Sequence, residues 1–362
     1  MAAALELARE GLGSSWPNPS VGCMLVKDGQ LIAKGQTSKT GRPHAEQNAL
    51  ALAGENAIGS LAYVSLEPCA HVGETSACAD LLAGAGIVKC IYALEDPDPR
   101  VSGRGGESMR KSGMEVQSGL LEDEARDLNQ GFFLRIKKKR PMITLKLATS
   151  SDGKIAASAV SAAGGGTKEK WITGRLAREQ GHYMRASHDA ILVGLGTILA
   201  DDPTLTCRIP GSENRSPVRI ILDSSLKTPV ASKLVQTADK VPVWIISEKA
   251  ANEKASKKYQ GMGVKILTVP DCRDLAGVLA HLAEEGLTRL MVEGGAKVSE
   301  SFLASGFVDH VAWFRAPVEL GDDALPALGG KDIALVLRQR GFRRISSEKI
   351  GNDVLEKFSA TH

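Results

Sequence analysis

The chain has 362 residues, of which 43% are hydrophobic and 24% charged, and its net charge is +3. These values are typical of a globular protein, and the length favours two domains. The near balance of charge argues against a dedicated nucleic-acid binder, and no apolar run reaches the roughly 18 residues that a membrane-spanning helix needs. The N-terminus is too acidic for a signal peptide, so we expect a cytoplasmic protein whose six cysteines are metal ligands or core residues.

The first part of the chain alternates strand-like and helix-like runs. After an amphipathic N-terminal helix, the turn Asp28-Gly29 predicts a hairpin of residues 21–27 and 31–34. Helices are predicted at 45–52 and 78–83, and strands at 61–66 and 87–93. Strands that alternate with helices indicate an α/β layered domain.

A basic run follows, and the second part alternates again. Residues 135–141 hold five lysines or arginines and end in Pro141. We interpret 136–141 as a solvated linker rather than a phosphate or nucleic-acid patch, which predicts domains over 1–135 and 142–362. The second domain has predicted strands at 142–148, 190–193, 218–222, 241–246, 264–269, 289–292 and 311–314, and predicted helices at 177–185, 275–285 and 296–303. The glycine-rich run 158–167 is predicted to be a loop.

One group of residues in the first part has the composition of a catalytic metal site. His44 and Glu46 open a predicted helix, Cys69 follows a predicted strand, and Cys78 comes after Cys69 with eight residues between them. One histidine and two cysteines can hold a tetrahedral zinc and leave the fourth position for water. Zinc lowers the pKa of that water to about 7, and Glu46 can carry its proton to a leaving ammonia. We predict one catalytic Zn²⁺ per chain with Glu46 as the proton carrier.

Simpler explanations exist for each residue of this pattern. Zinc deaminases of nucleobases show the pattern H-x-E…P-C, but their two cysteines are usually separated by two residues. His44 alone would more often cap a helix, and Cys69 and Cys78 alone would more often be core thiols. A structural zinc, or no zinc, is therefore the alternative. His71 is a competing ligand that we interpret as facing substrate.

Several segments together resemble the bifunctional riboflavin-biosynthesis deaminase/reductase family, and the resemblance covers nearly the whole chain. It implies a cytidine-deaminase-like three-layer α/β/α domain followed by a dihydrofolate-reductase-like α/β domain. The first would remove the 2-amino group of a diaminopyrimidinone ribosylamino phosphate. The second would reduce the ribosyl group to a ribityl chain with NADPH. The segments that carry the resemblance are Pro17–Gly22, Pro43–Glu46, Leu66–Asp80, Glu95–Pro99 and Gly103–Gly105.

The same resemblance implies roles for individual residues. Asn18 and His71 would line the pyrimidine pocket. Substrate contacts in the second domain would come from Lys146, Glu169, Arg185, Leu205, Arg208 and Glu293. Cofactor contacts would come from Ala148, Trp171, Thr197, Asp201, Gly295, Ala296, Lys297, Val298, Ser299, Glu300 and Ser301.

Physical arguments support part of this assignment. Gly294 and Gly295 follow an apolar strand and open a predicted helix, where backbone amides can bind phosphate. The alternative for this segment is a tight turn without a ligand. Gly194-Leu195-Gly196 lacks the third glycine of a dinucleotide-binding fingerprint, so we do not predict a Rossmann domain.

The chain also departs from the family. Glu169 stands where the family usually has a serine, and the segment 154–171 is several residues longer than usual. A carboxylate there would repel a phosphosugar unless a neighbouring lysine compensates. One alternative is therefore a deaminase with a degenerate, non-catalytic second domain. Another is a nucleic-acid or nucleoside deaminase, but only 4% of the residues are aromatic. As partners we expect small pyrimidine ribosylamino phosphates and further copies of this chain, and neither nucleic acid nor a membrane.

Overall fold

The computed structural model describes residues 1–70, 76–156, 171–248 and 256–361. It divides into two compact units, residues 1–141 with 283–288 and residues 142–282 with 289–362. The predictions for His71, Glu169 and the glycine-rich run 158–167 lie outside the described residues. Within the described ranges, no helix combines the length and the apolar character that crossing a membrane requires.

The first unit is built on a five-stranded sheet in the order β2-β1-β3-β4-β5. Strand β1 pairs antiparallel with β2 and β3, whereas β3, β4 and β5 run parallel to one another. The predicted hairpin is confirmed, and Asp28 and Gly29 both adopt the positive φ that its tight turn requires. The strands are β1 (Gly22–Lys27), β2 (Gln30–Gln36), β3 (Leu61–Val64), β4 (Lys89–Tyr92) and β5 (Glu115–Ser118).

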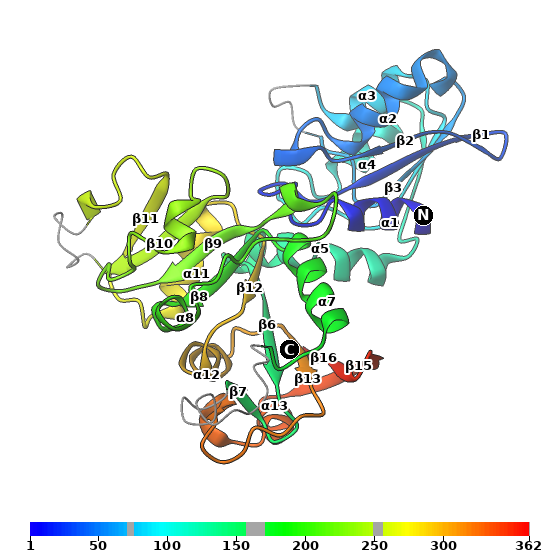
Figure 1. Cartoon of the computed structure of the whole chain (residues 1–362). Helices are drawn as coiled ribbons and strands as arrows, with labels where there is room; N and C mark the ends of the chain where they lie inside the picture. The colour runs from blue at the N-terminus through cyan, green and yellow to red at the C-terminus, as the bar shows by residue number, and fades with distance from the viewer. Residues whose placement is uncertain (71–75, 157–170, 249–255, 362) are drawn as a thin grey trace. The chain divides into compact units, whose positions relative to one another are not determined.

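Helices cover both faces of this sheet, as Figure 1 shows. Helices α2 and α3 lie on one side, and α1 and α5 pack together on the other. Helix α4 links β4 to β5 and packs against α3. The helices are α1 (Ala2–Glu10), α2 (Ala45–Ala53), α3 (Cys78–Gly84), α4 (Arg104–Lys111) and α5 (Glu122–Lys138). The three-layer α/β/α arrangement predicted for this half is confirmed.

The basic run that we interpreted as a linker is only partly outside regular structure. Helix α5 continues to Lys138, and Lys139 ends it with a φ of +55°. Its first turn is acidic and its last turn holds Arg135, Lys137 and Lys138. Both ends therefore complement the helix dipole, which is positive at the N-terminus and negative at the C-terminus. This charge arrangement, rather than a need for solvation alone, explains the basic run.

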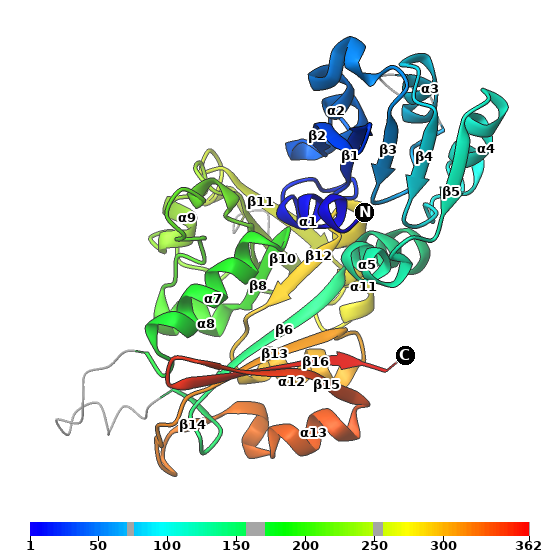
Figure 2. The same cartoon turned by 90° about the vertical axis from the view of Figure 1, so that its right-hand side faces the viewer.

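The second unit contains a nine-stranded sheet in the order β11-β10-β9-β8-β12-β6-β13-β16-β15. All neighbours from β11 to β13 run parallel, and β16 and β15 add an antiparallel hairpin. Figure 2 shows β6 between β12 and β13. The strands are β6 (Met142–Thr149), β8 (Ala190–Gly194), β9 (Val218–Leu222), β10 (Val243–Glu248), β11 (Val264–Val269), β12 (Arg289–Val292), β13 (His310–Arg315), β15 (Phe342–Ile350) and β16 (Asp353–Ala360).

Helices and a small second sheet complete this unit. The predicted strands are all confirmed, and so are the three predicted helices, which are α7, α11 and α12. The helices are α7 (Arg175–Ala186), α8 (Leu195–Asp201), α9 (Lys233–Gln236), α11 (Leu275–Glu284), α12 (Ala296–Ser305) and α13 (Ile333–Gln339). Strands β7 (Lys154–Ala156) and β14 (Leu325–Pro326) pair antiparallel.

Candidate active sites

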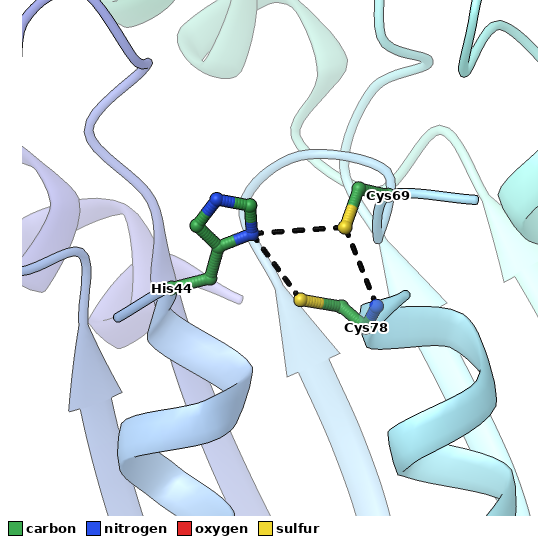
Figure 3. Close-up of side chains that lie close together, drawn as sticks. All are labelled: His44, Cys69 and Cys78. Carbon is green, nitrogen blue, oxygen red and sulfur yellow. Dashed lines mark hydrogen bonds between the residues drawn. The ribbon is translucent and has the colours of Figure 1, made fainter. Parts of the chain in front are cut away.

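Three side chains of the first unit converge as the sequence predicts. The Nδ1 atom of His44 lies 3.3 Å from Sγ of Cys78 and 3.6 Å from Sγ of Cys69. All three donor atoms lie within 4.8 Å of one another, so one ion can bind them together. Figure 3 shows that they come from separate places, the start of α2, the loop after β3 and the start of α3. A nitrogen and two sulfurs are the donors that zinc prefers, so the residues present fit this metal.

Local sequence explains how His44 is presented. His44 caps α2, and its backbone N–H donates to Oε1 of Gln47 at 2.9 Å, which fixes the start of the helix. Asn18 donates from Nδ2 to the carbonyl of Gly41 at 2.9 Å, in the turn that leads into His44. Gly41 has a φ of +89°, and a Cβ there would lie 2.6 Å from Nδ2 of Asn18. Asn18 therefore supports this turn, and its proposed contact with pyrimidine stays a prediction.

Burial and mutual contact shift the pKa values of Glu46, Cys69 and Cys78. Glu46 lies in the first turn of α2 and is 3% exposed, and burial together with the charge of Cys69 raises its pKa to about 7. A hydrogen bond from Cys78 lowers the pKa of Cys69 to about 4, and the same contact raises the pKa of Cys78 above its usual range. If Cys69 and Cys78 both held a metal, they would do so as thiolates, and metal binding would release their thiol protons.

The second unit contains a compact ionic cluster made of Lys146, Arg185 and Glu293. Nζ of Lys146 lies 2.8 Å from Oε1 of Glu293, and Nη2 of Arg185 lies 2.8 Å from Oε2. Burial alone would raise the pKa of Glu293, but Arg185 and Lys146 outweigh it and hold this pKa at about 2. Lys146 lies on β6, and Glu293 directly follows the neighbouring strand β12. The structure therefore brings together three of the predicted substrate contacts.

Two more residues that we predict to contact substrate, Leu205 and Arg208, lie in a short segment after α8. The carbonyl of Thr206 accepts from Nη1 of Arg185 at 3.1 Å, which places this segment beside the ionic cluster. Leu205 is 4% exposed and has a φ of +52°, a strained conformation for a leucine. Arg208 donates from Nη1 to Oγ1 of Thr204 at 2.9 Å. Strain of this kind is retained where the surroundings demand it, as at binding sites.

His182, for which no role was predicted, holds this segment in place. Its Nδ1 accepts from the backbone N–H of Arg208 at 3.3 Å, and it is 9% exposed. Burial, followed by the charges of Arg185 and Arg208, lowers its pKa to about 4, so the imidazole is neutral near pH 7. His182 stands three residues before Arg185 on α7. That spacing, which puts two residues on one helix face, was the available signal.

The predicted cofactor turn lies at the start of α12. Gly295 caps this helix, and among the described residues a Cβ on Gly295 would meet only Oγ1 of Thr197, at 3.5 Å. A Cβ on Gly294 would instead lie 2.7 Å from Cβ of Val298, and one on Gly194 would lie 2.8 Å from its Cγ2. The side chain of Val298 thus fills the space between the turns after β8 and β12. A methyl on Gly295 would thus make only ordinary van der Waals contact with the described residues, whereas one on Gly294 would collide with Val298.

The other predicted cofactor residues occupy varied environments. Ala296 and Lys297 form the first turn of α12, whereas Ser299 is buried. Glu300 lies beside Gly329, and Ser301 donates to the carbonyl of Lys297 within the helix. Thr197 and Asp201 belong to α8, Ala148 to β6, and Trp171 is 51% exposed with the guanidinium of Arg178 over its ring. Their contacts with a cofactor stay predictions.

Comparison with known proteins identifies both halves. Residues 1–94 match the family described as the cytidine and deoxycytidylate deaminase zinc-binding region, and residues 141–355 match the RibD C-terminal domain. The riboflavin biosynthesis protein RibD of Aquifex aeolicus is 40% identical over 355 residues, which cover 98% of this chain and 96% of that protein. RibD of Escherichia coli is 37% identical over 338 residues, which cover 90% and 88%.

Solved structures agree along the full length. RibD of Acinetobacter baumannii, in its form 1, superposes with a TM-score of 0.86 at 35% identity and covers 100% of this chain and 98% of its own. The diaminohydroxyphosphoribosylaminopyrimidine deaminase/5-amino-6-(5-phosphoribosylamino)uracil reductase of Thermotoga maritima gives 0.84 at 34% identity, with 100% and 97% covered. The chain therefore belongs to the RibD family of bifunctional riboflavin-biosynthesis proteins, in which a deaminase domain of the zinc-binding type precedes a reductase domain.

Proposed function

We propose that the first unit deaminates 2,5-diamino-6-ribosylamino-4(3H)-pyrimidinone 5′-phosphate at a single zinc ion held by His44, Cys69 and Cys78. The second unit then reduces 5-amino-6-(5-phosphoribosylamino)uracil to its ribityl product with NADPH. The observation that carries the first step is the convergence of one imidazole and two thiols beside the buried carboxyl of Glu46. The names of the Thermotoga maritima relative support the choice of both substrates.

In the deaminase, the chain itself supplies ligands and a proton carrier. A bound zinc ion lowers the pKa of a water that it holds to about 7, which makes hydroxide available near neutral pH. Glu46 lies two residues after His44 and outside the ligand triad, so its carboxyl can take the proton that such a water gives up. From there Glu46 can return the proton to the leaving ammonia.

In the reductase, the chain positions two ligands for a direct hydride transfer. Arg185 and Arg208 can each form a fork of hydrogen bonds to the substrate phosphate. The amides at the start of α12, beside Gly295, can bind a phosphate of the dinucleotide. The choice of NADPH over NADH rests on the family resemblance. The described part of the chain retains Lys146, Arg185 and Glu293 in contact, which disfavours a degenerate second domain.

The near-neutral charge and low aromatic content also support an enzyme that acts on small molecules rather than on nucleic acid. We further propose that the enzyme works in the cytoplasm as a homo-oligomer. Both points are testable, by fractionation of cells and by light scattering of the purified chain.

A coupled assay tests the proposed function directly. The purified chain receives the diaminopyrimidinone ribosylamino phosphate, and ammonia release and NADPH oxidation are followed together while bound zinc is counted. We expect ammonia first, NADPH oxidation after it, and about one zinc per chain. Ammonia release without NADPH oxidation would refute the reductase assignment, and a chain that releases ammonia with no metal bound would refute the zinc site.

Metal removal should separate the two activities. Treatment with a chelator is expected to abolish ammonia release, because without zinc the pKa of the attacking water is no longer lowered. Reduction of the deaminated intermediate should continue at its original rate, since the ionic cluster of the second unit contains no metal donor set among the described residues. Added Zn²⁺ should restore ammonia release. Equal loss of both activities would contradict the assignment of separate sites.

Two adjacent glycines should respond differently to alanine. Gly294→Ala is expected to destabilise the second unit, because the new methyl would lie 2.7 Å from Cβ of Val298. Gly295→Ala meets no close neighbour and should keep wild-type stability, but its methyl should raise the KM for NADPH by obstructing the helix terminus. Urea unfolding and NADPH saturation curves distinguish the two variants. An unchanged KM in Gly295→Ala would contradict phosphate binding at this turn.

A further inference from the structure

The first unit contains a buried carboxylate for which the proposed reaction has no use. Glu67 lies in the loop between β3 and the zinc ligand Cys69, and it is 3% exposed. Its Oε2 accepts from the backbone N–H groups of Gly103, at 3.0 Å, and Asp96, at 3.2 Å. Its Oε1 accepts from the N–H of Gly106 at 3.0 Å. A single side chain thus binds three amides that lie 29 to 39 residues further along the chain.

Two of these amides belong to the start of α4. Gly103 caps the helix with a φ of +75°, and the N–H of Gly106 is one of the amides that lack a partner within a helix. A carboxylate at a helix N-terminus also interacts favourably with the helix dipole. The approach is close, because a Cβ on Gly105 would lie 2.0 Å from the carbonyl oxygen of Pro68. Helix α4 is therefore seated directly on Glu67 and Pro68.

Helix α4 in turn supports the helix of the second zinc thiol. It packs against α3, and Oγ of Ser108 donates to Oδ1 of Asp80 at 2.9 Å. Cys78 is the first residue of α3, and its backbone N–H donates to Sγ of Cys69 at 3.3 Å, as Figure 3 shows. The segments that carry the two thiols are thus joined through α4 and Glu67 as well as directly.

We propose that Glu67 is a positioning residue for the zinc site. Its carboxylate fixes the segment of Cys69 against α4, and through α4 it fixes the distance between the sulfurs of Cys69 and Cys78. The inference rests on the zinc site proposed above. Groups that orient metal ligands without touching the metal commonly change metal affinity or activity by about 10- to 100-fold when they are replaced.

The variant Glu67→Gln tests this proposal with little change of shape. Each carboxylate oxygen of Glu67 accepts at least one N–H, so the amide nitrogen of glutamine would face a donor whichever way it turns. Glu67→Asp keeps the charge but is one methylene shorter, so it should recover part of the function. Glu107→Gln is the matched control, because Glu107 lies on the same helix α4, is exposed and pairs with Lys111.

Zinc affinity is measured by competition with a chromophoric chelator, and the cobalt-substituted proteins give the ligand-field spectrum. We expect Glu67→Gln to bind zinc about 10- to 100-fold more weakly and to shift the cobalt spectrum. Its kcat for ammonia release should fall at saturating zinc, while its reductase rate stays at the wild-type value. Glu67→Asp should fall between Glu67→Gln and wild type, and Glu107→Gln should match wild type.

The outcomes separate this inference from the zinc site itself. If wild type and Glu107→Gln bind no zinc, the proposed site fails. If they bind zinc and Glu67→Gln has the same affinity and cobalt spectrum, the positioning role is wrong. An equal loss of zinc affinity in Glu107→Gln would also overturn it, because any change of charge on α4 would then weaken zinc binding. Should Glu67→Gln not fold, Glu67→Asp must bind zinc more weakly than Glu107→Gln for the inference to stand.

Discussion

Replacement of Glu46 by glutamine is expected to slow ammonia release by about 100- to 10,000-fold, the range typical for loss of a general acid–base. The glutamine keeps the size of the side chain, which matters because Glu46 is 3% exposed and tightly enclosed. It would remove the proposed ability to hold and return a proton, whereas the three proposed zinc ligands are untouched. Ammonia release and zinc content of the purified variant are the measurements.

Two readouts control for indirect effects of this substitution. Zinc content should remain at about one per chain, because Glu46 is not among the converging donors. Reduction of the deaminated intermediate should proceed as in wild type, since that reaction uses residues of the other unit. Substantial ammonia release by Glu46→Gln would show that another group carries the proton.

The second large effect is expected at Glu293. Its replacement by glutamine leaves the cations of Lys146 and Arg185 without their counter-ion. Water compensates poorly for this loss, because the two side chains are only 19% and 13% exposed. Removal of one member of a fully buried ion pair commonly costs about 3–5 kcal/mol, and this partly exposed cluster should lose less than that. We expect the reductase kcat/KM to fall by at least about 100-fold, because the two cations lose the geometry that this carboxylate gives them. Urea unfolding and NADPH oxidation measure the two effects.

Glu179→Gln is the control for this variant, because Glu179 lies on α7 and pairs with Arg175 at the surface. Such an exposed pair contributes little, so stability and reduction should stay near wild type. Ammonia release should be unchanged in both variants. A Glu293→Gln chain as active as Glu179→Gln would exclude a role for the cluster in reduction.

Acid titration gives an independent check on the same cluster. The pKa of Glu293 falls from 4.5 to about 2 in the folded chain, so its carboxylate binds fewer protons there than in the unfolded chain. Its stabilising effect is therefore complete above about pH 4.5 and is lost as the pH falls toward 2. Glu293→Gln should lack this part of the acid dependence. An identical pH–stability curve for the two proteins would contradict the depressed pKa.

The zinc site was predictable because its signals are local and chemically specific. His44 and Glu46 lie two residues apart at the start of one helix, and the two cysteines bracket a single loop, so the residue types and their places in the predicted elements indicated a zinc site and a proton carrier. Glu67 was not predictable in this way. Its partners lie around Gly103, and their approach depends on how α4 packs, which no local pattern encodes.

The second unit shows the same limit. Resemblance identified Lys146, Arg185 and Glu293 one by one, but the contact of Lys146 with Glu293 follows from the adjacency of β6 and β12 in the sheet, and Arg185 reaches Glu293 from α7. The hairpin of β15 and β16 was missed because a register shift between Arg344 and Ser346 breaks the alternation of side chains. Its turn at Gly351, with a φ of +64°, was the remaining signal.

During synthesis on the ribosome, β6 is made long before the two strands that flank it in the sheet, β12 and β13. Met142 pairs with Arg289, and Leu145 pairs with Val311, so the strand made first in this unit waits for partners made roughly 150 residues later. At the usual pace of translation this delay is on the order of ten seconds. During that time β6, five of whose eight residues are apolar, has neither of its neighbours. Slowed translation after residue 149 should therefore increase the amount of nascent chain that chaperones capture.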